Sequence, residues 1–190
     1  MKHRRAVLIA ICAASVAACA TSRPPTEPVV QDPRHGAPAV SSPRDLATFA
    51  ARPCDGPLSR QDLRPFGITV PGEQRAVPSG AQGCEWTDRT TRIEFGTVVY
   101  PDRDILVDTY RSRLFPIFVP TNIDGLPATL EQSARDSITC TITVGTAEDQ
   151  GFVSTYTQLE VPAGEQPDDP CGRGQRIVER IVAALPPLQK

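Results

Sequence analysis

The sequence predicts a single α+β domain in which an antiparallel β-sheet packs with helices and two disulfides brace the fold. Three observations support this class: short stretches alternate apolar and polar residues, one C-terminal segment carries a helical apolar stripe, and four cysteines follow an N-terminal export signal. A period of two is typical of half-buried strands, and a period near 3.6 is typical of amphipathic helices. With 190 residues, the chain has room for one such domain.

The first nineteen residues indicate export and lipid attachment. Basic residues 2–5 precede eleven apolar or small residues, 6–16, a length typical of a signal peptide and too short to span a membrane. The segment Val16-Ala17-Ala18-Cys19 is similar to a lipobox, in which the cysteine thiol receives diacylglycerol before cleavage. The alternative is an ordinary secretory signal cleaved after Ala20. We expect a signal peptide at 1–18 and a lipid on Cys19 that holds the protein on the extracytoplasmic face of the cell membrane.

A proline-rich stretch follows the lipidated cysteine. Prolines at 24, 25, 28, 33 and 38 stand among threonine, serine, glutamine and aspartate, with few apolar residues to bury. Such a composition is typical of an extended, disordered linker. We therefore expect a tether at 19–43 and a folded domain at 44–190.

Periodicity places the elements of this domain. The clearest strand covers 92–100, where Ile93, Phe95, Thr97 and Val99 share one face. The clearest helix begins after Asp169 as cap and Pro170 at its first position, and its apolar face runs to Leu185. Residues between 66 and 83 are expected to be a loop. Further strands are expected at 84–87, 117–123, 128–133, 138–144 and 152–161, and further helices at 59–64 and 102–115.

The cysteine count predicts two disulfides. Cys12 leaves with the signal peptide and Cys19 carries lipid, so four cysteines remain, and four allow three pairings. Sequential pairing closes two loops of about thirty residues, each contributing roughly 3.5 kcal/mol in the chain-entropy model. Zinc binding is the alternative, but no pair has C-x-x-C spacing and the domain has no histidine. The predicted pairs are Cys54–Cys84 and Cys140–Cys171.

Several function classes are disfavoured by missing residues. The net charge of −2 offers no basic excess for nucleic acid. Histidines occur only at His3, in the signal, and His35, in the tether, so a serine or cysteine nucleophile has no histidine base in the domain. Gly172-Arg173-Gly174 lacks the strand and lysine of a phosphate-binding loop. We expect no metal, no cofactor and no enzymatic activity.

Carboxylates offer the one route to an enzyme. Acidic pairs at two helix starts fit capping better than catalysis or calcium binding. Three glutamates on expected strands fit a solvated face, or, as the alternative, a convergent pair in a hydrolase that acts on envelope glycan. The acidic pairs are Asp102 with Asp104 and Asp168 with Asp169, and the glutamates are Glu94, Glu131 and Glu160.

Aromatic and apolar side chains supply the candidate binding patch. Trp86 stands beside Cys84 and either forms the floor of a pocket or packs in the core. The apolar run 115–119 lies at a helix-to-strand junction and, where exposed, is the best surface for a partner. The candidate patch is Trp86, Phe115, Ile117 and Phe118, although burial in the core is the favoured interpretation for each.

Together these segments resemble a known family. The resemblance covers 52–185 and rests on five features in order: Pro53-Cys54, Cys84-Glu85-Trp86, Gly125-Leu126-Pro127-Ala128, Cys140 in a strand and Asp169-Pro170-Cys171 before the last helix. The chain is similar to actinobacterial envelope lipoproteins grouped as domain of unknown function 3558. Arg52 departs from the family, which usually has Asp or Asn there. The resemblance implies a sandwich like that of PsbP-like proteins and brings no catalytic residues.

The expected function follows from the anchor and from the absence of catalytic groups. We expect a membrane-anchored extracytoplasmic lipoprotein with a non-catalytic binding or accessory role in the cell envelope. Its partner is the membrane through the lipid on Cys19, together with an envelope protein, a lipid or a small ligand. The alternatives are the glycan hydrolase and a purely structural lipoprotein.

Overall fold

The computed structural model describes residues 32–161 and 168–189, and Asp32–Lys190 forms one compact unit. The predicted lipidation site, Cys19, lies outside the described residues. One antiparallel sheet of seven strands has the order β1-β2-β3-β7-β6-β5-β4. The strands are β1 (Glu73–Ala76), β2 (Gln82–Asp88), β3 (Ile93–Tyr100), β4 (Ile117–Ile123), β5 (Leu126–Gln132), β6 (Thr139–Ala147) and β7 (Gln150–Gln158).

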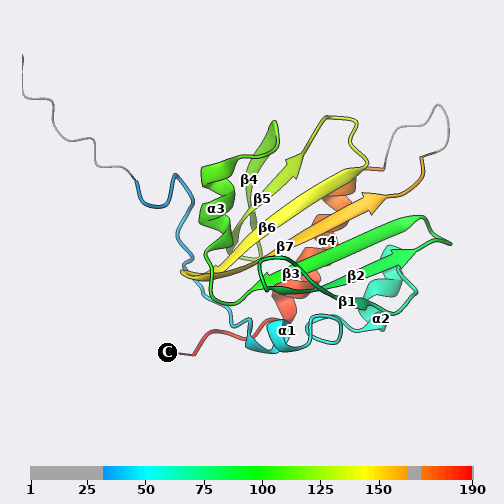
Figure 1. Cartoon of the computed structure of the whole chain (residues 1–190), viewed down its shortest axis with the longest axis horizontal. Helices are drawn as coiled ribbons and strands as arrows, with labels where there is room; N and C mark the ends of the chain where they lie inside the picture. Colours follow the sequence, from blue (N-terminus) through cyan, green and yellow to red (C-terminus); the bar gives the residue numbers. More distant parts are fainter. Residues whose placement is uncertain (1–31, 162–167, 190) are drawn as a thin grey trace, which may run out of the picture. The chain divides into compact units, whose positions relative to one another are not determined.

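Helices cover both faces of this sheet, so the predicted α+β class is confirmed (Figure 1). After β3, the chain crosses one face as α3 before it forms β4 at the far edge, and after β7 it crosses the other face as α4. The helices are α1 (Ala47–Ala51), α2 (Arg60–Leu63), the 3₁₀ turn η1 (Arg64–Phe66), α3 (Ile105–Ser112) and α4 (Pro170–Ala184).

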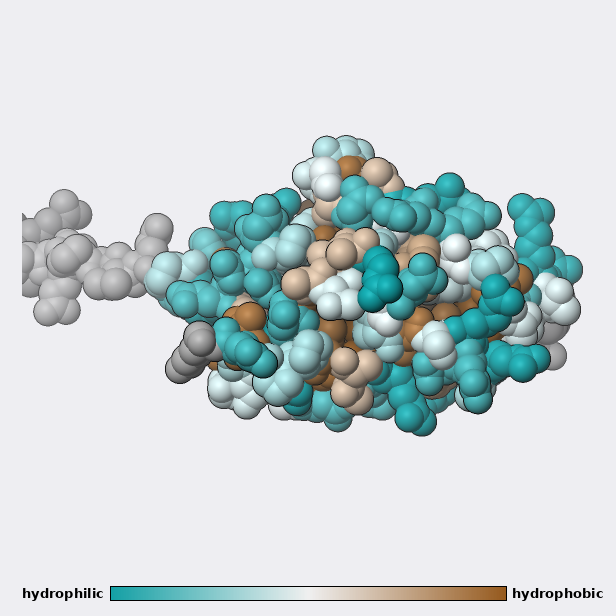
Figure 2. All heavy atoms as spheres, turned by 90° about the horizontal axis from the view of Figure 1, so that it is seen from below, coloured by the Kyte–Doolittle hydropathy of each residue, from teal (hydrophilic) through white to brown (hydrophobic). Residues whose placement is uncertain are grey.

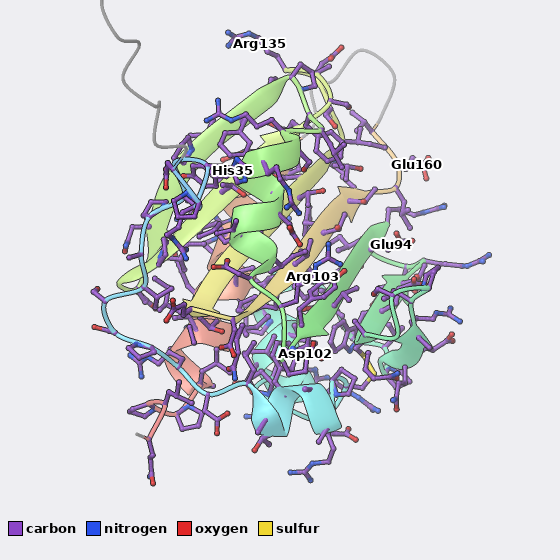
Figure 3. The ribbon with its side chains drawn as sticks, turned by 60° about the vertical axis from the view of Figure 1, so that its left-hand side comes forward. His35, Glu94, Asp102, Arg103, Arg135 and Glu160 are labelled. Atoms are coloured by element: carbon purple, nitrogen blue, oxygen red, sulfur yellow. A yellow bond between two sulfur atoms is a disulfide. The ribbon has the colours of Figure 1, made fainter. Side chains whose placement is uncertain are left out.

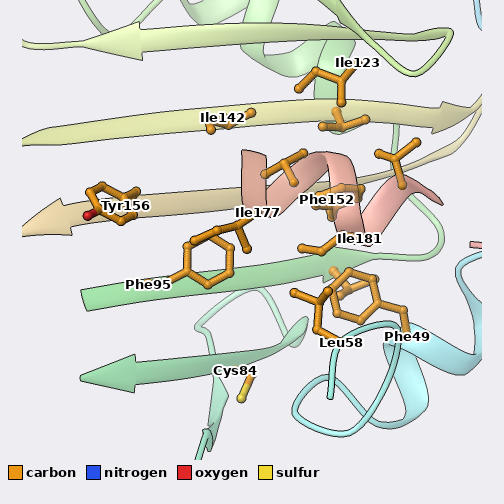
Figure 4. Close-up of a cluster of buried hydrophobic side chains, with 14 of the residues drawn as sticks. Phe49, Leu58, Cys84, Phe95, Ile123, Ile142, Phe152, Tyr156, Ile177 and Ile181 are labelled. Atoms are coloured by element: carbon orange, nitrogen blue, oxygen red, sulfur yellow. The ribbon is translucent and has the colours of Figure 1, made fainter. Parts of the chain in front are cut away.

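The main core lies between the sheet and α4 (Figure 4). Ile177 and Ile181 of α4 are fully buried and face Phe95, Tyr156 and other inward side chains of the strands. Burying a side chain of this size contributes about 1.5–3 kcal/mol. Gly174 permits the close approach, because a Cβ there would lie 2.9 Å from the Ile142 side chain and 3.0 Å from Tyr156.

The predicted helix caps at Ser59 and Asp169 and the predicted strand alternation are confirmed. Ser59 and Asp62 form a reciprocal capping box, and Asp104 and Asp169 cap α3 and α4 through their side chains. The alternation predicted for 92–100 is confirmed, because Ile93, Phe95, Thr97 and Val99 are buried and the residues between them are half-buried.

Both predicted disulfides are confirmed. Cys54–Cys84 ties the segment after α1 to β2 over 30 residues, and Cys140–Cys171 ties β6 to the first turn of α4 over 31 residues. Each therefore joins a strand of the sheet to a segment outside it, a turn after α1 in one case and the start of α4 in the other.

Two elements, β1 and α1, are not predicted by the sequence pattern. Strand β1 lies in the stretch predicted to be a loop, and all four of its residues are exposed, so no apolar alternation marks it. Helix α1 lies before the first predicted helix and buries only Phe49. Two apolar residues also lie outside the elements expected to contain them. Ile138, expected in a strand at 138–144, precedes β6 at 39% exposure, and Leu114, expected in a helix at 102–115, follows α3 at 80% exposure.

The expectation of a disordered tether as far as residue 43 is wrong for residues 32–43. The Asp32 carboxylate accepts hydrogen bonds from the backbone N–H groups of Arg34 and Gly36, which forms a turn. The Arg34 guanidinium pairs with Asp104 at 2.8 Å, and Ala37 is buried beside α3. A few specific contacts therefore order a proline-rich segment whose composition alone predicts none.

Candidate ligand-binding groove

An open groove runs between α3 and the sheet, toward the end of β5. It consists of two adjoining hollows of about 390 Å³ and 450 Å³. Phe115, Glu131 and Thr141 line both hollows, so these three side chains mark where the two join. The combined size lies within the range of small-ligand sites.

Polar side chains of β5 and β6 form the floor of the groove. In the register of these strands, Glu131 lies opposite Thr141 and Thr129 lies opposite Thr143. Successive strand residues point to opposite faces, so the intervening Ile142 and Leu130 point toward α4. One strand pair thus supplies both the apolar core and a floor rich in threonine.

Glu131 is the one carboxylate in this floor, and only 4% of its surface is exposed. The Thr129 hydroxyl donates a hydrogen bond to it at 3.0 Å, and the Thr143 side chain also bonds to it. Burial outweighs these two hydrogen bonds and raises the pKa of Glu131. Among the described residues no cation forms an ion pair with it. Glu131 is therefore a buried acid without a counter-charge.

Asp88 is a second buried acid, and it shows how several hydrogen-bond donors lower the pKa of a carboxyl group. It is also inaccessible to solvent, but it accepts hydrogen bonds from the Thr69 hydroxyl and backbone and from the backbone N–H groups of Thr90 and Thr91. These donors lower the pKa of Asp88 to about 2, with the Thr69 side chain as the largest cause. Glu131 has fewer donors, and its environment leaves its charge poorly compensated.

The wall opposite the floor is charged. Asp108 of α3 pairs with both Arg103 and Arg111, and all three side chains line the groove. Arg103 lies near the start of α3 (Figure 3). Two guanidinium groups share one carboxylate, so this wall carries an excess positive charge.

Apolar side chains flank the groove. The helix ends where Arg113 adopts a left-handed conformation with φ of 40°, and this turn leaves Leu114 outside the helical stripe. Leu114 and the half-buried Phe115 line one hollow, and Ile138 lines the other. On the face shown in Figure 2, hydrophilic side chains predominate and apolar ones form small separate areas. Leu114 and Ile138 are exposed apolar side chains that line the groove.

The structure does not bring the predicted patch together. Trp86 is buried, with its ring 5.7 Å from that of Phe95. Phe118 packs edge-on against Tyr110, with ring centroids 5.0 Å apart. Ile117 is half-buried, and the alternation of β4 turns it to the face opposite Phe118. Of the four residues, Phe115 alone lines the groove.

The three strand glutamates do not converge. Glu94 on β3 is separated from Glu131 by three strand spacings, about 14 Å between backbones, whereas glycosidase carboxyl groups lie about 5–10 Å apart. Glu160 is exposed and pairs with Arg92 at 3.2 Å. In Figure 3, Glu94 and Glu160 both lie to the right of α3.

Residues 32–161 and 168–189 contain neither a candidate metal cluster nor a candidate membrane-spanning helix. No group of three or more histidine, cysteine, aspartate or glutamate side chains in these ranges is arranged to hold a metal ion. No helix within them has the length and apolarity needed to cross a membrane.

Sequence reasoning missed most of the groove. It identified Glu131 and Phe115, but not Arg103, Arg111 or Thr141 as members of the same site. One signal was present: three threonines alternate along 139–143 on the face expected to be polar. The register that places Glu131 beside them depends on pairing across a turn.

The chain was compared with protein families, curated proteins and solved structures. No curated protein and no solved structure matches it. A family model described as "Protein of unknown function (DUF3558)" matches residues 12–184, which is most of the chain. The expected membership is thereby confirmed, and the chain belongs to the DUF3558 family of proteins of unknown function.

Proposed function

We propose that this chain is a membrane-anchored lipoprotein of the cell envelope whose domain binds an amphiphilic ligand in the groove beneath α3, without catalysis. The proposal combines the lipobox-like segment ending at Cys19 with the groove. A lipid anchor confines the domain to the membrane surface and raises its effective concentration toward envelope ligands. We further propose that the sheet and its helices form a sandwich of the PsbP-like kind.

One observation supports binding most strongly: the groove combines exposed apolar side chains with a polar floor. Leu114 is 80% exposed although solvent contact with an apolar side chain of this size is unfavourable. An acyl or other apolar chain resting on Leu114, Phe115 and Ile138 would cover that surface. The threonine hydroxyls and charged groups beside it suit a polar head.

Filling the groove is expected to weaken binding about tenfold or more. Thr141 is half-buried and lines both hollows, so Thr141→Trp places an indole ring where the ligand would lie. Displacing even two methylenes of the ligand, at about 0.8 kcal/mol each, weakens affinity about tenfold. The measurement is calorimetric titration of the purified protein with monomeric lysophosphatidylglycerol.

Thr87→Trp is the matched control, because Thr87 lies on β2 and lines neither hollow of the groove. It is expected to keep wild-type affinity. Equal binding by both variants, or no binding by the wild type, would contradict the proposed function.

A specific observation also supports the hydrolase as a second candidate. Asp108 and Glu131 line the same hollow, and burial raises the pKa of Glu131 whereas Asp108 pairs with two arginines. Two carboxyl groups in unlike surroundings are the usual starting point for acid–base chemistry on glycans. Release of product from envelope glycan by the wild type, and not by Glu131→Gln, would favour this candidate over binding.

A further inference from the structure

We propose that the ligand of the groove carries a primary ammonium group that pairs with Glu131, as in a phospholipid with an ethanolamine head. This inference rests on the proposed function and names the class of ligand. The observation behind it is the buried Glu131 carboxylate in the groove floor, which pairs with no cation among the described residues.

Among the described residues, no cation pairs with the Glu131 carboxylate although potential partners are near the groove. Arg103 and Arg111 are both engaged by Asp108. The guanidinium of Arg113 lies over the Phe118 ring, 4.8 Å from its centroid. A carboxylate removed from water is costly unless a cation or a proton compensates it. No described side chain supplies that cation, so a cationic group of the ligand can take the place of a compensating proton.

Hydrogen bonding around Glu131 leaves acceptor capacity for such a group. A carboxylate accepts about four hydrogen bonds, and Thr129 and Thr143 supply two. A primary ammonium offers three donors and no acceptor, so two of its donors can fill the two remaining acceptor sites. Glu131 and Thr141 lie where the two hollows join. A ligand in either hollow can therefore place its ammonium group beside Glu131.

The surroundings fit the rest of an ethanolamine phospholipid. The positive excess on α3, from Arg103 and Arg111 against Asp108, suits a phosphate next to the ammonium. Leu114, Phe115 and Ile138 offer apolar surface to an acyl chain. Asp136 lines the second hollow and adds a further negative charge, which favours a cationic over an anionic head on that side.

Matched single-chain lipids test this inference. We expect the wild type to bind lysophosphatidylethanolamine more tightly than lysophosphatidylglycerol of the same chain, because only the first carries an ammonium. Glu131→Gln keeps the shape of the side chain but removes its charge. It should weaken lysophosphatidylethanolamine binding about tenfold to a hundredfold and leave lysophosphatidylglycerol binding unchanged. Glu94→Gln, on the same face but outside the groove, should change neither affinity.

The outcomes separate this inference from the proposed function. If lysophosphatidylglycerol binds and Thr141→Trp weakens its binding, but Glu131→Gln does not alter the preference between lipids, the groove is a ligand site and the proposed ammonium pairing is wrong. If neither lipid binds the wild type, both proposals fail. If Glu131→Gln weakens the binding of both lipids equally, Glu131 supports the shape of the groove but does not recognise the ammonium group. The inference is then also overturned.

Discussion

Replacing Cys19 with alanine is expected to release the protein from the membrane fraction. The proposal that this chain is a lipoprotein assigns all membrane attachment to the diacylglycerol on that thiol. Burial of acyl chains contributes about 0.8 kcal/mol per methylene, so two chains hold a protein firmly and their loss leaves no comparable attachment. The measurement is immunoblotting of the membrane, soluble and culture-medium fractions.

Cys12→Ala provides the control for this experiment. Cys12 lies within the apolar stretch 6–16 and not at the predicted cleavage site, so this variant should remain with the membrane. Retention of Cys19→Ala at the wild-type level would refute the lipobox. Release of the wild type itself would support the ordinary secretory signal with cleavage after Ala20.

Removing the Cys140–Cys171 disulfide is expected to lower the free energy of unfolding by about 3.5–4 kcal/mol. The bond closes a loop of 31 residues, and opening it restores that conformational entropy to the unfolded chain. It also frees the first turn of α4 from the strand it covers. Since domains of this size are stable by about 5–15 kcal/mol, the loss is a large fraction of the total. Urea unfolding of the Cys140→Ala/Cys171→Ala double variant measures it.

The Cys54→Ala/Cys84→Ala variant is the internal comparison. Its loop of 30 residues is nearly the same length, so the chain-entropy account predicts a loss of similar size. Unfolding midpoints that match the wild type in either variant would contradict that account.

The parts of the fold that sequence predicts are those governed by local pattern. Pro170 and the cap at Asp169 define the start of α4, and alternation over 93–99 defines β3. Both signals involve neighbours within a few residues, and both elements bury one continuous face in the core. The disulfide pairing follows in the same way from spacing along the chain.

The groove was less predictable because it depends on pairing between strands. Glu131 and Thr141 are ten residues apart, and only the β5–β6 register places them side by side. Strand β1 has the same difficulty, because it is defined by its partner β2 and not by its own exposed residues. Residues 32–43 were assigned to a tether from composition, whereas the ion pair of Arg34 with Asp104 is a contact over 70 residues.

Crosslinking inside the cell tests whether the groove beneath α3 holds an amphiphilic ligand in the envelope. A diazirine-bearing leucine analogue at Leu114 reports on the groove, and the same analogue at Leu159, exposed at 40% and absent from the groove lining, is the control. After irradiation, mass spectrometry identifies lipid and protein adducts. If the groove holds a lipid, we expect a reproducible lipid adduct at 114 and none at 159. Adducts of equal yield at both positions, or none at 114 in a folded, membrane-bound protein, would contradict it.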